Sequence, residues 1–425
     1  MRKIEAGLNH SCKYLLCLAI LAMNILVSQN ILAGGLYLTQ ISTPGSVGTA
    51  GVANVVNRLT PDAAYTNPAG MTGIQNDMFM AGMQLAIPKI EFDSSIATAG
   101  GGDGGNAGEF AAIPGSYLVK VLSNDWRLGF SLSAPFGAGL DYGDNFVGRY
   151  SATRSTLGGV GMSPSLAYRV NDKLSIGGGV SFIYSQVDLD IAVNRPGPLP
   201  DGKVSFDKLD DWGVQGFLGL TYELNDRTVF GLVYRSKSSV DLRGDLKIKG
   251  APLINTLASS LDSAKISWDY PQLVSLGMRY KITDQLSIMA DADWEDWSEF
   301  ADNYVSIGGG TINTTIDRNW NDTWHGGVAM LYNLDEDHIA SAGISYDSSP
   351  VDDKFRTADL PVDEQLKLSV AYGKRGQGNL DYSFALSYIY LGDGKIDQTI
   401  QGVRYKGEFE TNYILFLAAT INYRF

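Results

Sequence analysis

The sequence predicts an all-β protein, a transmembrane 14-stranded antiparallel β-barrel with an N-terminal hatch, or plug, inside its lumen. Three observations lead to this fold class. Apolar and polar residues alternate with period two from about residue 77 to the C-terminus. Short turns and long loops separate the alternating segments in strict succession. After the N-terminus, no apolar run approaches the roughly 18 residues that a spanning helix needs.

The composition is that of a folded chain without affinity for nucleic acid. Of the 425 residues, 44% are hydrophobic and 11% aromatic, which excludes intrinsic disorder. Lys and Arg number 33 against 46 Asp and Glu, so the formal net charge is -13. Because an acidic chain without a basic stripe repels phosphate, we expect no nucleic-acid partner.

Residues 1–33 are predicted to be a secretory signal peptide. A basic start precedes an apolar run over 14–27, and Ala33 is the small residue expected at a cleavage site. An uncleaved anchor is the alternative. Both cysteines, Cys12 and Cys17, lie in this segment, so we expect no disulfide in the mature chain.

Alternation also places the strands of the barrel. Along 381–388, aromatic and aliphatic residues at even positions alternate with small and acidic residues at odd positions. A soluble sandwich would bury the apolar face, whereas strands this long and numerous can turn it toward lipid. We expect strands at 77–92, 110–121, 126–135, 153–170, 173–190, 208–223, 227–243, 264–281, 284–298, 318–333, 337–347, 364–374, 379–391 and 408–425.

The connections between these strands alternate in length. Long loops of roughly 16 to 20 residues are expected at 93–109, 136–152, 191–207, 244–263, 299–317, 348–363 and 392–407. Short turns of about two to four residues are expected at 122–125, 171–172, 224–226, 282–283, 334–336 and 375–378. Long loops at one end and short turns at the other are typical of an outer-membrane barrel, and closure removes the sheet edges.

Aromatic residues support the membrane interpretation. The last strand carries apolar residues at alternate positions and ends in Phe425. Five tryptophans fall near predicted strand ends, as an interfacial girdle requires. They are Trp126, Trp212, Trp294, Trp320 and Trp324. The alternative is that these rings pack the core of a soluble protein.

The alternation is absent between Gly34 and about Asn76. Small residues dominate this stretch, and Gly45 and Gly48 permit tight backbone packing. We predict a hatch domain at 34–76 ahead of a barrel domain at 77–425. A disordered tail is the alternative.

Residues 34–71, GGLYLTQISTPGSVGTAGVANVVNRLTPDAAYTNPAGM, resemble the hatch of the FadL/TodX family of outer-membrane transporters for hydrophobic compounds. Three further stretches are similar to the family: SAPFGAGLDY at 133–142, LVYRSKSSVDLRGDL at 232–246 and GISYDSSPVDD at 343–353. The resemblance implies a monomeric barrel in the bacterial outer membrane, in contact with lipid and lipopolysaccharide. It also implies that the barrel-assembly machinery recognises the C-terminal strand.

The same resemblance implies uptake of hydrophobic compounds. Long-chain fatty acids are the expected ligand, and neutral aromatic hydrocarbons or alkanes are the alternative. The ligand would be captured between the loops at 191–207 and 244–263, enter an apolar pocket and leave sideways through the wall. A side exit into lipid avoids exposing apolar area to water, which costs about 25 cal/mol per Å².

The resemblance places that exit at a kink in the third strand. Pro135, Phe136 and Gly137 occupy the position of the kink. Proline offers no donor to a strand ladder, and glycine within a strand commonly marks a bulge or bend. The alternative is that Pro135 only ends the strand at a loop.

The resemblance also assigns a gate in the hatch. Asn67, Pro68 and Ala69 would be the hatch residues that face the kink. An Asn-Pro turn by itself is more often ordinary loop punctuation. It is a gate candidate here only because the residues around it resemble the hatch of the family.

Members of the family that carry fatty acids place basic residues near the end of the fifth strand and in the tenth. The matching positions here are Ile191 and Asn321, so a neighbouring arginine would have to hold the carboxylate. The possible headgroup contacts are therefore Arg195, Arg318 and Asn321. If neither arginine points inward, a neutral ligand is favoured.

We expect no catalytic, metal or cofactor site. A metal site needs three or four ligands at suitable spacing, and His325 and His338 are separated by a turn. We interpret His325 as a polar residue facing the lumen. The chain contains no G-x-S-x-G motif, and the glycine-rich run 100–108 lacks the strand-to-helix unit of a phosphate loop. An outer-membrane hydrolase and a receptor or adhesin without transport remain as rival functions.

Overall fold

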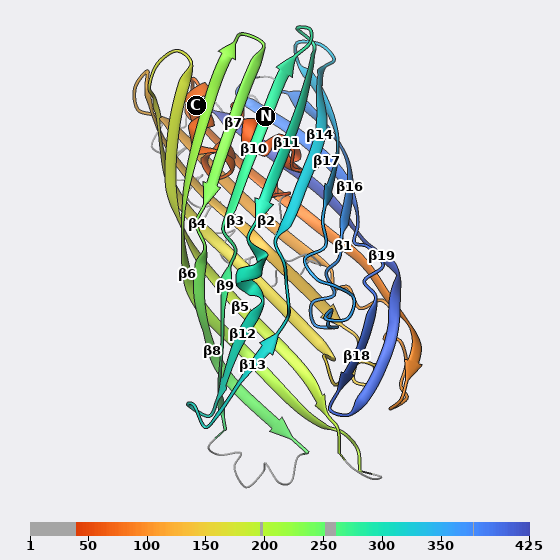
Figure 1. The fold of residues 1–425 in the computed structure, drawn as a ribbon. Helices are drawn as coiled ribbons and strands as arrows, with labels where there is room; N and C mark the ends of the chain where they lie inside the picture. Colours follow the sequence, from red (N-terminus) through yellow and green to blue (C-terminus); the bar gives the residue numbers. More distant parts are fainter. Residues whose placement is uncertain (1–39, 196–198, 251–260, 377) are drawn as a thin grey trace, which may run out of the picture.

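A single antiparallel sheet closes on itself to form the protein's wall (Figure 1). The computed structural model describes residues 40–195, 199–250, 261–376 and 378–425, so the predicted signal peptide lies outside the described residues. The sheet closes because β1 pairs with both β2 and the last strand, β19. Each of the 14 wall strands therefore has a neighbour on both sides, and the resulting ladders satisfy the backbone inside lipid except at one interval between β2 and β3 described below.

The strands have the following bounds: β1 (Met78–Ala97), β2 (Ala111–Val121), β3 (Trp126–Asp141), β4 (Arg154–Arg169), β5 (Leu174–Val193), β6 (Gly202–Asn225), β7 (Thr228–Arg235), β8 (Ser238–Lys249), β9 (Ser263–Tyr270), β10 (Leu273–Lys281), β11 (Leu286–Glu295), β12 (Asp302–Ile307), β13 (Ile312–Asp317), β14 (Thr323–Asn333), β15 (His338–Asp347), β16 (Gln365–Arg375), β17 (Leu380–Tyr390), β18 (Ile396–Ile400) and β19 (Val403–Arg424).

The predicted 14-stranded barrel is confirmed. Each predicted strand has a counterpart, since β7 with β8 and β9 with β10 form the two halves of single wall strands. The sequence did not predict β12, β13 and β18, which lie in stretches expected to be loops. They prolong the wall, because β12 pairs with β9 and β18 pairs with β19.

The wall is much taller than a bilayer. A barrel strand needs about 9–11 residues to cross the membrane, whereas β6 has 24 and β19 has 22. The excess lies at the end with the long connections, drawn at the bottom of Figure 1, and the short turns lie at the other end. The expected capture loops are thus partly strand, in β5, β6 and β8, and residues 196–198 and 251–260 lie outside the described residues.

The two faces of the wall differ as the alternation predicts. On β17, Phe384 is 60% exposed on the outside, whereas Ser387 is fully buried inside. Large apolar side chains are likewise exposed on strands all around the barrel. The apolar stripe therefore faces lipid, and the small and polar stripe faces the lumen.

The predicted girdle of tryptophans is wrong at one position. Trp126, Trp212 and Trp324 are 41%, 54% and 63% exposed on the outer surface, as expected. Trp320 is only 5% exposed and packs on the ring of Trp297, with centroids 5.3 Å apart. It lies ahead of β14 rather than in it, so the inside/outside register of the strand does not apply to it.

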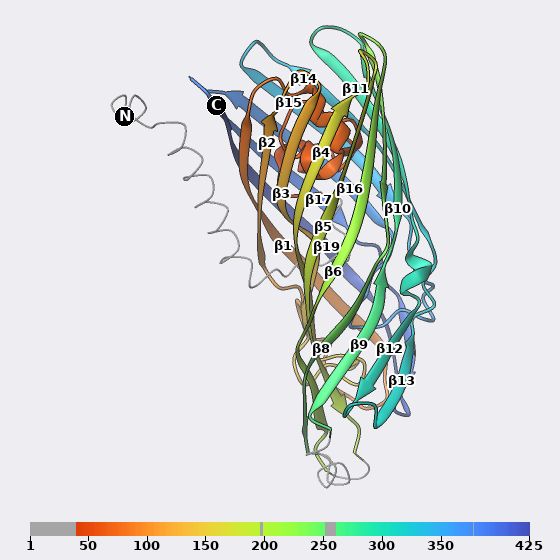
Figure 2. The ribbon, with the colours of Figure 1, turned by 90° about the vertical axis from the view of Figure 1, so that its left-hand side faces the viewer.

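The described part of the stretch before β1, residues 40–77, is called the N-terminal segment below. It contains short helices only: α2 (Pro44–Val47), η1 (Asn54–Val56), α3 (Ala63–Thr66) and η2 (Pro68–Gly73). Figure 2 shows these turns, in red and orange, inside the short-turn end of the barrel. One further helix, η4 (Trp297–Phe300), follows β11. Among the described residues, no helix has the length and apolarity to cross a membrane.

Candidate ligand channel and wall opening

Side chains on the inner face of the wall donate hydrogen bonds to the backbone of the N-terminal segment and attach it to the wall. Ser165 Oγ of β4 donates to the carbonyl of Ala64 over 2.9 Å, and Arg127 Nε of β3 donates to the carbonyl of Ile74 over 2.8 Å. On the opposite side, Ser345 Oγ of β15 donates to the carbonyl of Ala50 over 3.0 Å. Short irregular turns leave many carbonyls unpaired, and the polar inner face of the barrel satisfies them.

Inward-facing glycines form a ring around this segment, which we call the glycine ring. A Cβ atom at any of them would lie within 2.9 Å of an atom of the N-terminal segment. The ring consists of Gly82, Gly129, Gly177, Gly219, Gly231, Gly277, Gly327 and Gly343. The alternation of apolar and polar residues does not single out these glycines, although glycine at inward positions of successive strands indicates that another backbone approaches closely.

The gate candidates of the N-terminal segment contact the inner face of β5 and β6. Asn67 Nδ2 donates to the carbonyl of Leu220 on β6 over 3.2 Å. A Cβ at Gly177 of β5 would lie 2.7 Å from both Pro68 and Ala69. The helix η2, which begins at Pro68, also contacts β3, the strand of the predicted kink. Their role as a gate remains a prediction.

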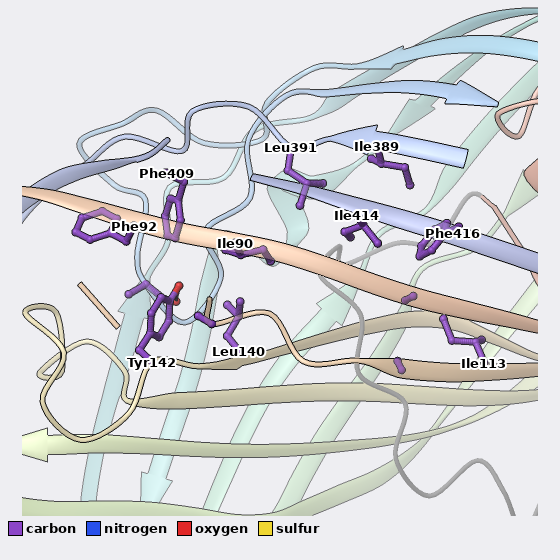
Figure 3. Close-up of a cluster of buried hydrophobic side chains, with 14 of the residues drawn as sticks. Ile90, Phe92, Ile113, Leu140, Tyr142, Ile389, Leu391, Phe409, Ile414 and Phe416 are labelled. Carbon is purple, nitrogen blue, oxygen red and sulfur yellow. Dashed lines mark hydrogen bonds between the residues drawn. The ribbon is translucent and has the colours of Figure 1, made fainter. Parts of the chain in front are cut away.

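Beyond the N-terminal segment, the lumen is apolar. One group of buried side chains, called the Phe92 cluster, comes from β1, β2, β3, β17, β18, β19 and the segment after β3 (Figure 3). The rings of Phe92 and Phe409 lie 5.1 Å apart, and Tyr142 stacks on Phe146 at 4.2 Å. Aromatic packing of this kind gives a wall patch suited to acyl chains or aromatic rings.

A second group, the Phe136 cluster, covers the facing side of the lumen. Phe136 of β3 stacks on Tyr270 of β9, with ring centroids 4.1 Å apart and planes at 8°. These strands are not neighbours in the sheet, so the two rings meet across the lumen. Trp268, Trp297 and Phe300 continue the cluster toward the long loops.

The long β15–β16 connection, residues 348–364, folds inward between these two clusters. Ala358 packs in the Phe92 cluster and Leu360 in the Phe136 cluster. Arg356, 1% exposed, fixes the loop through ion pairs to Asp353 at 2.6 Å and Asp363 at 2.9 Å. The cavity left beside the loop is about 20 Å³, far below the roughly 300 Å³ of a ligand pocket.

Of the three headgroup candidates, Arg318 lies inside the barrel. It is 6% exposed, stands over the ring of Phe300 at 5.7 Å and pairs with Asp359 of the inward loop at 2.7 Å. Burial acts to raise the pKa of the Asp359 carboxyl, but the charge of Arg318 outweighs it and holds that pKa below its ordinary value. Arg195 contacts only the carbonyl of Pro200 among its described partners, and Asn321 is exposed.

The wall is interrupted at the predicted kink. On the β4 side, pairing moves from Ser133 with Gly161 to Phe136 with Gly159, which leaves Ala134 and Pro135 unpaired. On the other side, the ladder between β2 and β3 stops at Leu132. Within the described residues it resumes only at 139–141, where residues 107–109 face β3. Two neighbouring strands therefore lack their mutual hydrogen bonds beside a bulge.

The strands also bring together three polar side chains that the sequence does not predict to be neighbours. Asp291 and Asp293 of β11 and His325 of β14 offer ligand atoms that all lie within 4.8 Å of one another. His325 faces inward, as expected. The period-two pattern does not predict the register in which β11 pairs with β14. Because the two strands are far apart in the sequence, nothing in it shows that these residues meet.

Replacing Gly231 of the glycine ring with valine should loosen the N-terminal segment. Its Cβ would lie 2.2 Å from the carbonyl oxygen of Val55, and overpacking of this kind costs about 1–3 kcal/mol. We expect an intact barrel with several-fold higher ion conductance in planar bilayers. Gly326→Val is the matched control, because nothing lies within 4 Å of a Cβ there. Equal conductance in the two variants would contradict the packing account.

The family model for "Outer membrane protein transport protein (OMPP1/FadL/TodX)" matches residues 24–425. Among curated relatives, the long-chain fatty acid transport protein of Escherichia coli O6:H1 is 22% identical over 94% of this chain and 96% of its own. Outer membrane protein P1 of Haemophilus influenzae is 23% identical over 86% of this chain and 87% of its own.

Solved structures show the same fold. A Pseudomonas aeruginosa FadL homologue superposes with a TM-score of 0.84 at 23% identity, over 92% of this chain and 100% of that one. The Pseudomonas putida toluene transporter TodX gives 0.68 at 16% identity, over 93% of this chain and 99% of that one. The match of the family model across nearly the whole chain, on a closed barrel with an apolar lumen, shows that the chain belongs to the OMPP1/FadL/TodX family, as an outer-membrane transporter of hydrophobic compounds.

Proposed function

We propose that this transporter takes up long-chain fatty acids and releases them sideways into the membrane. The observation that carries the choice of ligand is the contact between Arg318 and Asp359. A buried guanidinium already binds a carboxylate at the edge of an aromatic cluster, with Phe300 beneath it. A fatty acid offers the same carboxylate with an apolar chain attached, so it can replace Asp359 and extend along the Phe136 cluster.

Exchange of one carboxylate for another also gives a route for opening the lumen. Asp359 belongs to the inward loop at 348–364, so its release from Arg318 frees one attachment of that loop. Arg318 also donates to Thr357 of the same loop over 3.2 Å. Displacement of the loop would enlarge the small cavity between the two apolar clusters into a pocket for an acyl chain.

The interrupted pairing between β2 and β3 supports the lateral exit. Proline at 135 removes a donor at this place, and the bulge at 134–135 directs Phe136 into the lumen. Strands without mutual hydrogen bonds can separate at lower cost than paired ones, so an apolar molecule beside Phe136 has a direct path to lipid. Asn67, Pro68 and Ala69 are proposed as a gate for the route toward the periplasm, on β5 and β6.

A neutral aromatic hydrocarbon or alkane is the second candidate ligand. One observation favours it, which is that Asp359 already neutralises Arg318. A neutral ligand would need no charge exchange and would use the Phe92 and Phe136 clusters alone. Rival functions without transport, as a hydrolase or an adhesin, do not use these apolar clusters.

Replacing Gly137 with valine tests the exit. A β-branched side chain beside the bulge should stiffen the strand and narrow the opening, so uptake of labelled oleate by cells should fall several-fold while barrel assembly is unchanged. Gly216→Val is the matched control, since a Cβ there has only Ser236 nearby, at 3.8 Å. Uptake that stays at the wild-type rate in Gly137→Val would count against a side exit at β3.

Arg318 and Asp359 distinguish the two ligand classes. Arg318→Met should weaken oleate binding about tenfold or more, because it removes a charge-assisted hydrogen bond worth about 1.5–3 kcal/mol. Asp359→Asn should instead strengthen it, because the competing carboxylate loses its charge. Binding is followed by the fluorescence of the nearby tryptophans in folded protein, with toluene as the neutral probe. If neither variant changes oleate affinity, the neutral ligand is favoured.

A further inference from the structure

The polar group on β11 and β14 has the arrangement of a metal site. Asp291 and Asp293 are two residues apart on β11, so both side chains point inward from the same face of the strand. His325 lies directly opposite Asp293 in the β11–β14 ladder. Three potential ligands therefore converge from two adjacent strands of a rigid wall.

The histidine is oriented by partners behind it. Its Nδ1 lies 2.9 Å from a carboxylate oxygen of Asp347 on β15, and Asp347 is held in turn by Lys367 of β16 at 2.7 Å. This leaves Nε2 turned toward Asp291, 3.4 Å from its Oδ1. Metal-binding histidines usually have this arrangement, in which a carboxylate binds one ring nitrogen and the other nitrogen faces the ion.

One carboxylate oxygen in the group lacks the partner that burial demands. Asp293 Oδ1 is buried and has no hydrogen bond, and the only contact of Asp291 Oδ1 is the His325 Nε2 at 3.4 Å. Both residues are only 9% exposed, and the side chain of Asp291 is 2% exposed. A buried carboxyl oxygen requires a donor or a cation. A cavity of about 60 Å³ adjoins them, with room for an ion and a water molecule.

Two cations lie near the group. Lys367 is paired with Asp347, as described above. Arg235, which lines the same cavity, lies over the ring of Tyr65 at 4.1 Å and donates to the backbone carbonyl of that residue, while its Nη1 is buried without a hydrogen bond. Glu295, a further acid of the lining, accepts from Trp297 Nε1 over 2.6 Å. Three carboxylates, those of Asp291, Asp293 and Glu295, thus line the cavity with a single guanidinium, that of Arg235, and a divalent ion would balance the excess.

We propose that Asp291, Asp293 and His325 bind a divalent transition-metal ion, Zn²⁺ in the first place, between the wall and the N-terminal segment. Imidazole together with carboxylates suits Zn²⁺ rather than Mg²⁺ or Ca²⁺, which prefer oxygen alone. Tetrahedral Zn²⁺ with bonds of about 2.1 Å places neighbouring ligand atoms about 3.4 Å apart, which is the separation of His325 and Asp291. Water in the cavity supplies the fourth ligand.

The location gives the ion a structural role. Ile41, Asn54 and Thr66 of the N-terminal segment line the same cavity, opposite the acidic residues. An ion there neutralises the wall at the surface on which this segment rests. Its binding does not depend on which hydrophobic compound is transported, so the metal proposal and the proposed function can fail independently.

The test is a calorimetric titration with Zn²⁺ of the full-length protein, purified in mild detergent without a polyhistidine tag and stripped with a chelator. We expect one Zn²⁺ per barrel. Asp293→Asn and His325→Gln should each weaken binding about 100-fold or more, and Asp347→Asn about 10–100-fold through loss of histidine orientation. His338→Gln is the matched control, because His338 pairs with Asp335 in an exposed turn away from the group.

Folding of each variant is checked by the heat-dependent shift of the barrel in gel electrophoresis. Asp293→Asn keeps the volume of the side chain. If His325→Gln does not fold, the zinc titration of Asp293→Asn alone decides the outcome. Absence of stoichiometric Zn²⁺ binding to the wild-type protein overturns the proposal. Binding that persists unchanged in Asp293→Asn also overturns it, and then Asp291, His325 and Asp347 form a buried ion triad only.

Discussion

The constraint on which the structure depends is that a bilayer offers no water to backbone amides and carbonyls. It forces the strands into a closed ladder, so β1 must pair with β19 as well as β2. A break in the ladder is then a feature that needs a reason. The interval between β2 and β3, bordered by the bulge at 134–135, is such a break, and it adjoins the ring of Phe136 inside the lumen. A passage for apolar molecules is the function that fits this place.

Closure also separates the demands on the two faces of each strand. The large apolar side chains lie outside, against lipid. The inner face can therefore carry glycine, polar or aromatic residues, and which of these it carries changes along the barrel axis. At the short-turn end, the glycine ring lets the N-terminal segment approach the wall closely, because glycine has no side chain in the way. At the other end, the Phe92 and Phe136 clusters form an apolar interior, which the 348–364 loop fills and Arg318 holds through Asp359.

Period-two alternation was sufficient to predict the closed barrel, its strand number and its lipid-facing residues, because each strand obeys the same two-sided environment. It failed for Trp320, which lies outside a wall strand and turns inward onto Trp297. The alternation also does not predict contacts between residues distant in the sequence, because the whole sheet determines the strand register and the paths of the loops. The pairing of Arg318 with Asp359, the approach of Asp293 to His325 and the placement of Asn67 against β6 are all of this kind.

The central claim is that the lumen holds a hydrophobic molecule. Its most direct test is mass spectrometry of small molecules that remain bound to the protein after extraction in mild detergent. The account predicts about one long-chain acid, or one neutral hydrocarbon, per barrel, and its loss when an aspartate replaces Phe136 in the lumen. A wild-type barrel that retains no apolar molecule, and acquires none on incubation with oleate or toluene, would contradict it.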